Sequence, residues 1–398
     1  MNVPKLRFKE FTDKWQKVPL NLFTNIYGGY AFKSENLLNY KAKYQVIKMG
    51  NVNNNTLNLE KNPSYLNTIS QKELPYLLEK NDIILTLTGT FGKKDFGYSY
   101  QIKNETNLLL NQRLAVFKIT NSNYSANFLK YILLNNTFLN KFFRFSVGGT
   151  GNQANVSIQD IKSFKIPFPK LEEQNKIANF LTTVDKKITN LENTIISLEN
   201  QKKGLLQQIF SQKLRFKDKN GNNYPNCEKK KLEDIAIFLD NKRKPLEQSE
   251  RIHGKYPYYG ASGIIDYIND YIFDEELVLL SEDGANIIDR NYPICYIATG
   301  KYWVNNHAHV LKVKSQYVNK FICESLEQLN YTKYNTGTAQ PKLNQDVCRK
   351  IILSIPCLEE QTKIANFLST FDRKLENQKA QLEHWKQIKK GLLQQMFV

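Results

Sequence analysis

Residues 171–210 read LEEQNKIANFLTTVDKKITNLENTIISLENQKKGLLQQIF, and residues 358–397 read LEEQTKIANFLSTFDRKLENQKAQLEHWKQIKKGLLQQMF. The two stretches align without a gap at an offset of 187 residues, and 22 of the 40 aligned positions are identical. A repeat of this length indicates one structural unit that occurs twice. It divides the 398-residue chain into two halves that share a plan.

Apolar residues recur in both stretches at alternating steps of four and three, which is the a/d pattern of a coiled coil. We therefore expect long helices at 171–210 and 358–397 that pack on each other, antiparallel if a pseudo-twofold axis relates the halves. Lys202 and Lys389 occupy the same seam position, where a polar residue commonly sets the register. The predicted seam consists of Ile177, Leu181, Val184, Ile188, Leu191, Ile195, Leu198, Ile364, Leu368, Phe371, Leu375, Leu382 and Trp385.

The repeat extends weakly upstream of the helices. Lys5–Lys9 recurs as Lys213–Lys217, and Gln153 and Gln340 each lie 18 residues before their helix, beside Gly148–Gly151 and Thr336–Thr338. Between these anchors, 14–147 and 225–335 show no obvious kinship. The predicted domains are a first variable domain at 1–150, a helical region at 151–212, a second variable domain at 213–340 and a C-terminal helical region at 341–398.

Both variable domains have the pattern of mixed α/β folds with many short strands, so the fold class is α/β (α+β) with a pseudo-twofold repeat. In the first domain we expect strands at 44–49, 82–87 and 113–119 and a helix at 126–143. In the second we expect strands at 264–272, 277–280, 294–298 and 309–313 and a helix at 321–329. The polar segment 217–231 is predicted to link the halves.

The net charge of +18 favours a polyanionic partner. The charge is uneven, because residues 1–150 carry 20 basic and 9 acidic side chains, whereas residues 225–340 carry 14 and 16. The five cysteines lack the spacing of a zinc site. No apolar run of about 18 residues is present, and the N-terminus has no signal core, so we expect a cytoplasmic protein.

Several motifs carry a resemblance to a known family. Ile166-Pro167-Phe168-Pro169 followed by Leu171-Glu172-Glu173-Gln174 recurs as Ile355-Pro356 followed by Leu358-Glu359-Glu360-Gln361, although the second copy lacks the second proline. With two dissimilar domains alternating with two similar helices, the whole chain resembles the specificity subunit of Type I restriction-modification systems. Other family-like stretches are Gly50–Val52, Asn81–Ile84, Tyr259–Gly263, Glu282–Asn286 and Trp303–Ala308.

The resemblance implies a non-catalytic subunit of a bacterial defence complex. Each variable domain would be a target-recognition domain that reads one half of a bipartite, gapped site in double-stranded DNA. The paired helices would dock two methyltransferase subunits, with or without two restriction subunits. No cofactor belongs to this chain, because the methyl donor, Mg²⁺ and ATP would be held by those partners.

Side chains suited to phosphates or base edges form several clusters, and each has a structural alternative. The loop at 88–94 could cradle a phosphate or be a hairpin turn, and Asn111–Arg113 could read bases or begin a strand. Gln153 and Gln340 could contact DNA or cap the helix entry, and His307 is most often a buried core residue. The DNA-contact candidates are Thr88, Thr90, Lys93, Lys94, Asn111, Gln112, Arg113, Arg144, Gln153, Lys242, Arg243, Tyr259, Ser262, Lys301, Asn305, Asn306, His307, Gln340 and Lys342.

Other functions have weaker support. Asn62-Pro63-Ser64-Tyr65 departs from the adenine-methyltransferase tetrapeptide at the serine, and no glycine-rich loop precedes it. Glu275-Glu276 and Glu282-Asp283 lack a nuclease arrangement, and we interpret them as solvated faces. A metal site through His307 and His309 lacks a third ligand nearby in the sequence. A coiled-coil adaptor without DNA specificity would explain the helices but neither the two dissimilar domains nor the charge.

Overall fold

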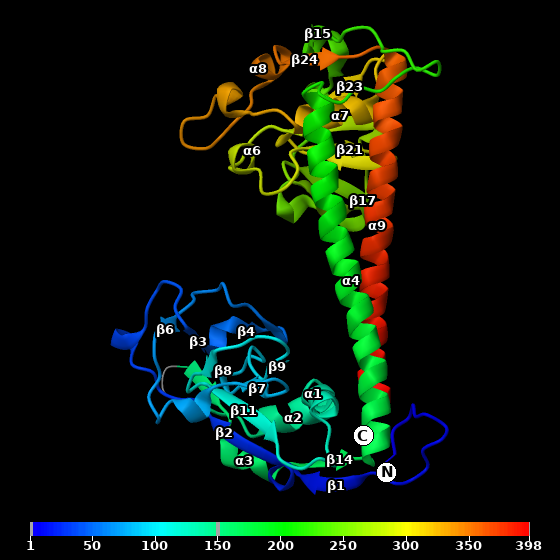
Figure 1. The fold of residues 1–398 in the computed structure, drawn as a ribbon. Helices are drawn as coiled ribbons and strands as arrows, with labels where there is room; N and C mark the ends of the chain where they lie inside the picture. The colour runs from blue at the N-terminus through cyan, green and yellow to red at the C-terminus, as the bar shows by residue number, and fades with distance from the viewer. Residues whose placement is uncertain (1–2, 149–151, 398) are drawn as a thin grey trace. The chain divides into compact units, whose positions relative to one another are not determined.

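The computed structural model describes residues 3–148 and 152–397, so Gly149, Thr150 and Gly151 lie outside the described residues. The chain forms two compact units, one of residues 1–192 and 381–398 and the other of residues 193–380. Each unit contains one globular domain and parts of two long helices, α4 (Leu171–Phe210) and α9 (Leu358–Gln395) (Figure 1). In the first unit, the start of α4 packs with the end of α9, and in the second unit the opposite ends pack.

The first unit is built on a four-stranded antiparallel sheet in the order β2 (Thr24–Gly28), β11 (Leu114–Ile119), β7 (Ile83–Thr86) and β9 (Ser99–Gln101). A second sheet has the order β10 (Leu108–Leu110), β3 (Tyr44–Ile47) and β6 (Tyr65–Leu66), with β10 and β3 parallel. A third has the order β12 (Val147–Gly148), β13 (Gln153–Asn155) and β8 (Thr88–Thr90). Two further pairs are β1 (Gln16–Pro19) with β14 (Lys165–Phe168) and β4 (Val52–Asn53) with β5 (Thr56–Leu57). The shorter helices are α1 (Ala126–Leu133), α2 (Asn136–Arg144) and α3 (Ile158–Ser163).

The second unit has a four-stranded antiparallel sheet in the order β16 (Ala236–Phe238), β23 (Ala308–Val313), β20 (Leu277–Ser281) and β21 (Cys295–Ala298). Its second sheet has the order β18 (Gly263–Ile268), β17 (His253–Gly260), β22 (Lys301–Val304) and β19 (Phe273–Asp274), with β17 and β22 parallel. β15 (Glu228–Lys231) pairs with β24 (Ile352–Ile355). The shorter helices are α5 (Leu232–Ile235), α6 (Asn286–Asp289), α7 (Asn319–Glu327) and α8 (Gln345–Arg349).

The two globular domains share one topology, although their sequences show no obvious kinship. β2, β11, β7 and β9 correspond in sheet order and direction to β16, β23, β20 and β21, and the parallel pair β10–β3 corresponds to β22–β17. The backbone hydrogen bond from Asn111 to the Ile47 carbonyl has its counterpart from Asn305 to the Tyr259 carbonyl. Shared strand order and shared loop hydrogen bonds extend the internal repeat over the whole chain.

The structure confirms most of the predicted strands and helices within one or two residues. Three expectations need correction. The helix expected at 126–143 is two helices, because the first ends at Leu133 and Asn135 caps the second by accepting from the Thr137 amide. The strand expected at 264–272 ends at Ile268. The segment expected as a linker at 217–231 ends in β15, which joins the sheet pair with β24.

The predicted antiparallel packing of the two long helices is confirmed inside each unit. In the first unit, Ile177 and Leu181 of α4 share a core cluster with Met396, and Leu392 packs against that cluster. In the second unit, Ile364 and Leu368 of α9 share a cluster with Leu206 and Ile209. Every predicted seam residue of α4 is buried, as are Ile364, Leu368 and Leu375, while Phe371, Leu382 and Trp385 are half-buried.

Ion pairs explain the polar seam position that interrupts both copies of the repeat. Lys389 Nζ lies 2.7 Å from an Asp185 carboxylate oxygen in the first unit, and Lys202 Nζ lies 2.6 Å from Asp372 in the second. The four residues are equivalent in pairs, since the 187-residue offset relates Asp185 to Asp372 and Lys202 to Lys389. Each lysine therefore meets the aspartate of the opposite helix, a complementarity that fixes antiparallel register.

A second repeated contact ties the segment before each domain to the start of a long helix. Arg7 donates two hydrogen bonds to buried Glu173, and Arg215 donates two to buried Glu360. A guanidinium fork that faces a carboxylate in this way is rigid and charge-assisted. Because both carboxylates are almost fully buried, their partners keep them from being uncompensated charges in the interior.

We predict that Asp185→Ala destabilises the first unit by about 2–3 kcal/mol, because the substitution leaves partly buried donors without an acceptor. Asp185 accepts from the Tyr131 hydroxyl at 2.8 Å and also pairs with Lys130 and Lys389. The matched control is Glu192→Ala on the same helix, whose pair with Lys386 is nearly half exposed and is expected to contribute less than about 1 kcal/mol. Urea unfolding of both variants measures their free energies of unfolding. Equal losses in the two variants would contradict the role of Asp185 as the ion-pair partner within the seam.

Candidate nucleic-acid interface

A polar groove opens on the first domain where β7 passes into β8 and where β13 leads into α3. Thr88, Gln112, Arg113 and Gln153, all predicted DNA-contact residues, come together in its lining. The remaining lining residues are Leu87, Asn155, Val156, Ser157, Ile158 and Gln159. The described lining thus offers amide, hydroxyl and guanidinium groups and includes no carboxylate.

Strand pairing places the groove's polar side chains on one face. In the antiparallel pair of β13 with β8, Gln153 lies opposite Thr90 and Asn155 lies opposite Thr88. Directly opposed residues point to the same face of a sheet, so these side chains share it. Ala154 between them points to the other face and is buried. The result is a small sheet with an apolar underside and a hydrogen-bonding surface.

The loop before β11 is held by its backbone, which leaves its side chains free. The Gln112 amide donates to the Tyr30 carbonyl at 3.0 Å, and the Arg113 carbonyl accepts from the Leu87 amide at 3.1 Å. Gln112 and Arg113 are exposed. Within residues 3–148 and 152–397, neither side chain has an assigned hydrogen bond or ion pair. An arginine held this way presents its full set of five donors to a ligand.

The second domain carries a groove at the corresponding place. Ser262, Asn305, His307 and Gln340, again predicted DNA-contact residues, line it together. The other lining residues are Gly260, Ala261, Ile265, Ser281, Asp283, Gly284, Ala285, Asn286, Ile287 and Tyr292. His307 Nδ1 lies 2.8 Å from an Asp283 oxygen, and the imidazole is half exposed. The expectation that His307 is a buried core residue is therefore wrong, and the buried histidine is His309.

Backbone contacts relate positions of the two domains, and three of these related pairs, 88/283, 113/307 and 153/340, line the groove in both. The Glu282 amide donates to the His307 carbonyl at 2.9 Å, and the Leu87 amide donates to the Arg113 carbonyl in the same way. The β-bridge between Asp283 and Lys342 likewise matches the strand pairing of Thr88 with Asn155. Gln153 and Gln340 are related by the 187-residue offset. The two domains thus carry different side chains on the same backbone frame at four pairs of equivalent positions, namely 88/283, 112/306, 113/307 and 155/342. The fifth pair, 153/340, is glutamine in both domains.

The remaining first-domain candidates lie beside the groove or on nearby elements. Lys93 and Lys94 are exposed on the loop after β8, which is closed by hydrogen bonds from Thr90 to Asp95 at 2.8 and 2.6 Å. Asn111 is half-buried, and Arg144 is exposed at the end of α2 and does not line the groove.

The remaining second-domain candidates are more dispersed. Lys242, Lys301 and Asn306 are exposed, and the Lys301 ammonium lies over the Tyr271 ring. Tyr259 stacks on Tyr296. The Lys342 ammonium pairs with Glu282 at 3.4 Å. Arg243 is mostly buried, and its guanidinium donates to Glu282 at 2.7 Å.

Sequence reasoning missed several groove residues, namely Asn155, Ser157, Gln159, Asp283 and Asn286. Asn155 could have been found from the 187-residue offset, because its equivalent is the candidate Lys342. Asp283 was interpreted as part of a solvated face, but its carboxylate is largely covered and paired with His307. Nothing in the local sequence shows that pairing, since 24 residues separate the two side chains.

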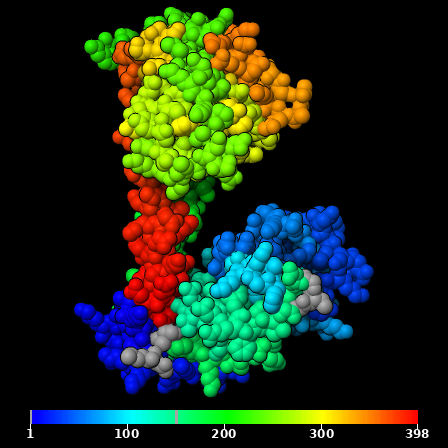
Figure 2. Space-filling model, turned by 180° about the vertical axis from the view of Figure 1, so that it is seen from behind, coloured from blue at the N-terminus to red at the C-terminus, as the bar shows by residue number. Residues whose placement is uncertain are grey.

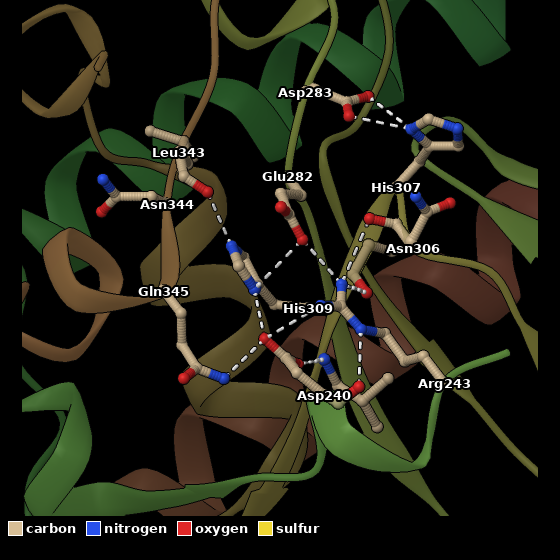
Figure 3. Close-up of polar contacts among 12 residues, drawn as sticks. Asp240, Arg243, Glu282, Asp283, Asn306, His307, His309, Leu343, Asn344 and Gln345 are labelled. Atoms are coloured by element: carbon tan, nitrogen blue, oxygen red, sulfur yellow. Dashed lines mark hydrogen bonds and ion pairs between the residues drawn. The ribbon is translucent and has the colours of Figure 1, made fainter. Parts of the chain in front are cut away.

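A polar network lies beneath the second groove (Figure 3). His309 Nδ1 is 2.6 Å from Asp240, and its Nε2 is 2.7 Å from the Leu343 carbonyl. Arg243 bridges Asp240 and Glu282, and Gln345 donates to Asp240 at 2.8 Å. In the first domain, the equivalent positions are the apolar residues Gly28, Leu87, Ala115 and Ile158.

The network is a set of matched charges. Burial by itself disfavours the imidazolium, but the contacts with Asp240 and Cys348 outweigh it and raise the pKa of His309 to about 10. Burial also opposes ionisation of Asp240, and the hydrogen bond from His309 outweighs it, so the pKa of Asp240 is lowered. Asp240, Glu282 and His309 could in principle surround a metal ion. Arg243 and the protonated His309 already neutralise the two carboxylates, and both imidazole nitrogens are engaged, so the cluster gives no argument for a metal.

We predict that His309→Gln destabilises the second unit by about 2–4 kcal/mol at pH 6, because it leaves Asp240 buried with less compensation. The pKa of His309 is higher in the folded state than the ordinary value of 6.5. Its stabilisation is therefore full below pH 6.5 and is lost as the pH rises through about 10.

Thermal unfolding of wild type and His309→Gln at pH 6 and pH 9.5 checks this, with a smaller difference expected at the higher pH. The matched control is His307→Gln in the half-exposed pair with Asp283, which should change stability little. A penalty for His309→Gln that does not change with pH would contradict a charged imidazole in the network.

Comparison with known proteins gives a consistent family. A family model described as "Type I restriction modification DNA specificity domain" matches residues 12–200 and 224–384. The chain is 38% identical over 139 residues to a putative Type I restriction enzyme specificity subunit of Haemophilus influenzae, a match that covers 35% of this chain and 36% of that relative. It is 25% identical over 358 residues to the MjaVIII specificity subunit of Methanocaldococcus jannaschii, covering 82% and 80% of the two chains.

Solved structures agree in fold. The S subunit of a Type I restriction-modification system from M. genitalium matches with a TM-score of 0.63 at 18% identity, covering 100% of this chain and 99% of that one. A chain from a structure of the assembly and conformational transition of the Type I system matches with a TM-score of 0.56 at 13% identity, covering 95% and 96%. In the described part of the chain, no helix is long and apolar enough to cross a membrane.

Proposed function

The chain belongs to the family of Type I restriction-modification DNA specificity proteins, a family with a DNA-recognition role, and from this premise we propose that it is the DNA-reading subunit of such a complex. Each globular domain reads one half of a bipartite site in double-stranded DNA. The chain itself is not an enzyme, and the methyl donor, Mg²⁺ and ATP belong to partner subunits.

One observation carries this proposal, namely a groove built twice on one backbone frame with different side chains. A protein that reads two different half-sites needs a constant frame and variable readers, because base identity is read by side chains at the groove edges. The function of a structural adaptor does not require two such grooves with different side chains. The acidic balance of residues 225–340 is compatible with DNA binding, since Glu282 and Asp240 are neutralised internally by Arg243 and His309.

The paired helices are the proposed docking surface for two methyltransferase subunits, with or without two restriction subunits. In the view of Figure 2, side chains of α9 lie uncovered at the surface. The outer positions of both helices alternate exposed lysine, glutamate, asparagine and glutamine with the buried seam. Such a surface suits a polar interface that does not disturb the seam.

We expect single-molecule sequencing to find a new gapped methylation motif in a host that carries the partner methyltransferase together with this gene. The motif should have two short defined halves and a fixed spacing, and it should be absent from the same host without the gene. A stable complex that produces no motif would contradict DNA reading by this chain. Self-association without DNA binding would favour the adaptor.

A second prediction concerns phosphate contacts by the loop after β8. Lys93→Glu/Lys94→Glu should weaken DNA binding for all sequences and reduce the salt slope of the binding constant by about 2, because two phosphate contacts are lost. The matched control is Lys217→Glu/Lys219→Glu, two exposed lysines of the segment between the halves that lie outside the groove linings and the paired helices and change the net charge equally. Fluorescence anisotropy across a salt series measures the DNA affinity and salt slope of both variants. Equal effects in the two variants would attribute the loss to net charge and not to a phosphate contact of this loop.

A further inference from the structure

We propose that one pair of equivalent positions in each domain selects the base, namely Thr88 with Arg113 in the first domain and Asp283 with His307 in the second. Arg113 is assigned to guanine and Asp283 to the amino group of cytosine. Gln153 and Gln340 make the same contact in both halves. This inference rests on the proposed function and names the residues that give it specificity.

The first argument is positional. Arg113 and His307 each directly precede a central strand, β11 or β23, and their carbonyls accept the equivalent amides of Leu87 and Glu282. Thr88 and Asp283 directly follow those amides in the chain. Backbone hydrogen bonds therefore fix both positions of each pair to the sheet, while their side chains line the groove. Fixed backbones with variable side chains are what selective readout requires.

The second argument is chemical. Arg113 is exposed and has no assigned side-chain partner among the described residues, and no acidic residue lines its groove. A free guanidinium in a groove of amides matches the O6 and N7 acceptors of guanine, which arginine contacts with two parallel hydrogen bonds. Thr88 beside it is short and uncharged, so it leaves the guanidinium unpaired.

The second domain has the opposite chemistry at the same place. Asp283 brings a carboxylate, and His307 Nδ1 holds it through contacts of 2.8 and 3.0 Å. That contact orients the carboxylate and leaves it further acceptor capacity. A carboxylate repels phosphates and accepts from the cytosine N4 amino group. The glutamines at 153 and 340 are exposed in both grooves and do not differ, so they position the DNA and do not distinguish the halves.

The test is selection of bound DNA from a randomised duplex library by the complex of this chain with its methyltransferase subunits, followed by sequencing. Arg113→Lys keeps the charge but removes the guanidinium fork. We expect it to lower discrimination for guanine at one position of one half-site by about tenfold or more, without changing the other half. Asp283→Asn should lower the discrimination between bases at one position of the other half-site and leave the first half-site unchanged.

Arg144→Lys is the matched control, because Arg144 is an exposed arginine of the same domain outside the groove lining. Lysine keeps the charge that a phosphate contact needs, and phosphate contacts do not select bases, so the selected motif should equal that of wild type even with Arg144 among the DNA-contact candidates. Gln153→Ala should weaken binding to all DNA sequences by the same factor. Thermal melting of each variant separates loss of fold from loss of reading.

Two outcomes overturn the inference alone. One is a wild-type motif that Arg113→Ala and Arg113→Lys both leave unchanged. The other is a uniform loss of affinity in Arg113→Ala that Arg113→Lys restores, since this would make Arg113 a phosphate contact. A wild-type complex that selects no motif would instead overturn the proposed function, and this inference with it.

Discussion

The antiparallel seam between α4 and α9 is the constraint on which both units depend. Each unit uses the start of one helix and the end of the other. The first unit joins residues 1–192 with residues 381–398, whereas the second is the continuous stretch 193–380. In the first unit, the core that receives Trp15 and Phe128 also receives Phe397 from the C-terminus. The paired lysines and aspartates of the seam then decide direction, because apolar a/d residues alone would tolerate other registers.

Equivalent backbone hydrogen bonds follow the two long helices. After α4, the Leu214 amide donates to the Gln208 carbonyl at 3.1 Å. At the equivalent place in the first unit, the Leu6 amide donates to the Gln395 carbonyl at 2.9 Å, although these residues lie at opposite ends of the sequence. Arg7 and Arg215 continue the equivalence by binding Glu173 and Glu360. A covalent connection in one half is therefore replaced by a non-covalent contact in the other.

The sequence was sufficient to predict the long helices, because a seven-residue apolar pattern is a strong local signal that was present twice. It was also sufficient to select Gln112, Arg113, Gln153, Asn305, His307 and Gln340, which the structure brings to the two grooves. It indicated mixed α/β folds in both domains, but it did not reveal that their strands correspond one by one. The reason is visible beneath the grooves, where Gly28, Ala115 and Ile158 are replaced by Asp240, His309 and Gln345. An apolar contact and a hydrogen-bonded ion network fill the same space, so the pattern of apolar residues differs while the backbone does not.

This exchange bears on how the groove side chains of such a protein can vary. The hydrogen bonds that fix the groove run between backbone atoms, as in the pairs Leu87–Arg113 and Glu282–His307, and backbone groups do not depend on residue identity. Side chains above the frame can then change without moving it, and side chains below can change from apolar to polar if every buried group finds a partner. The second domain satisfies that condition, because Asp240, Arg243, Glu282 and His309 compensate one another. Variation at the groove is thus separated from stability by a layer of main-chain hydrogen bonds, which is why two grooves with side chains of opposite charge, Arg113 and Asp283, can share one fold.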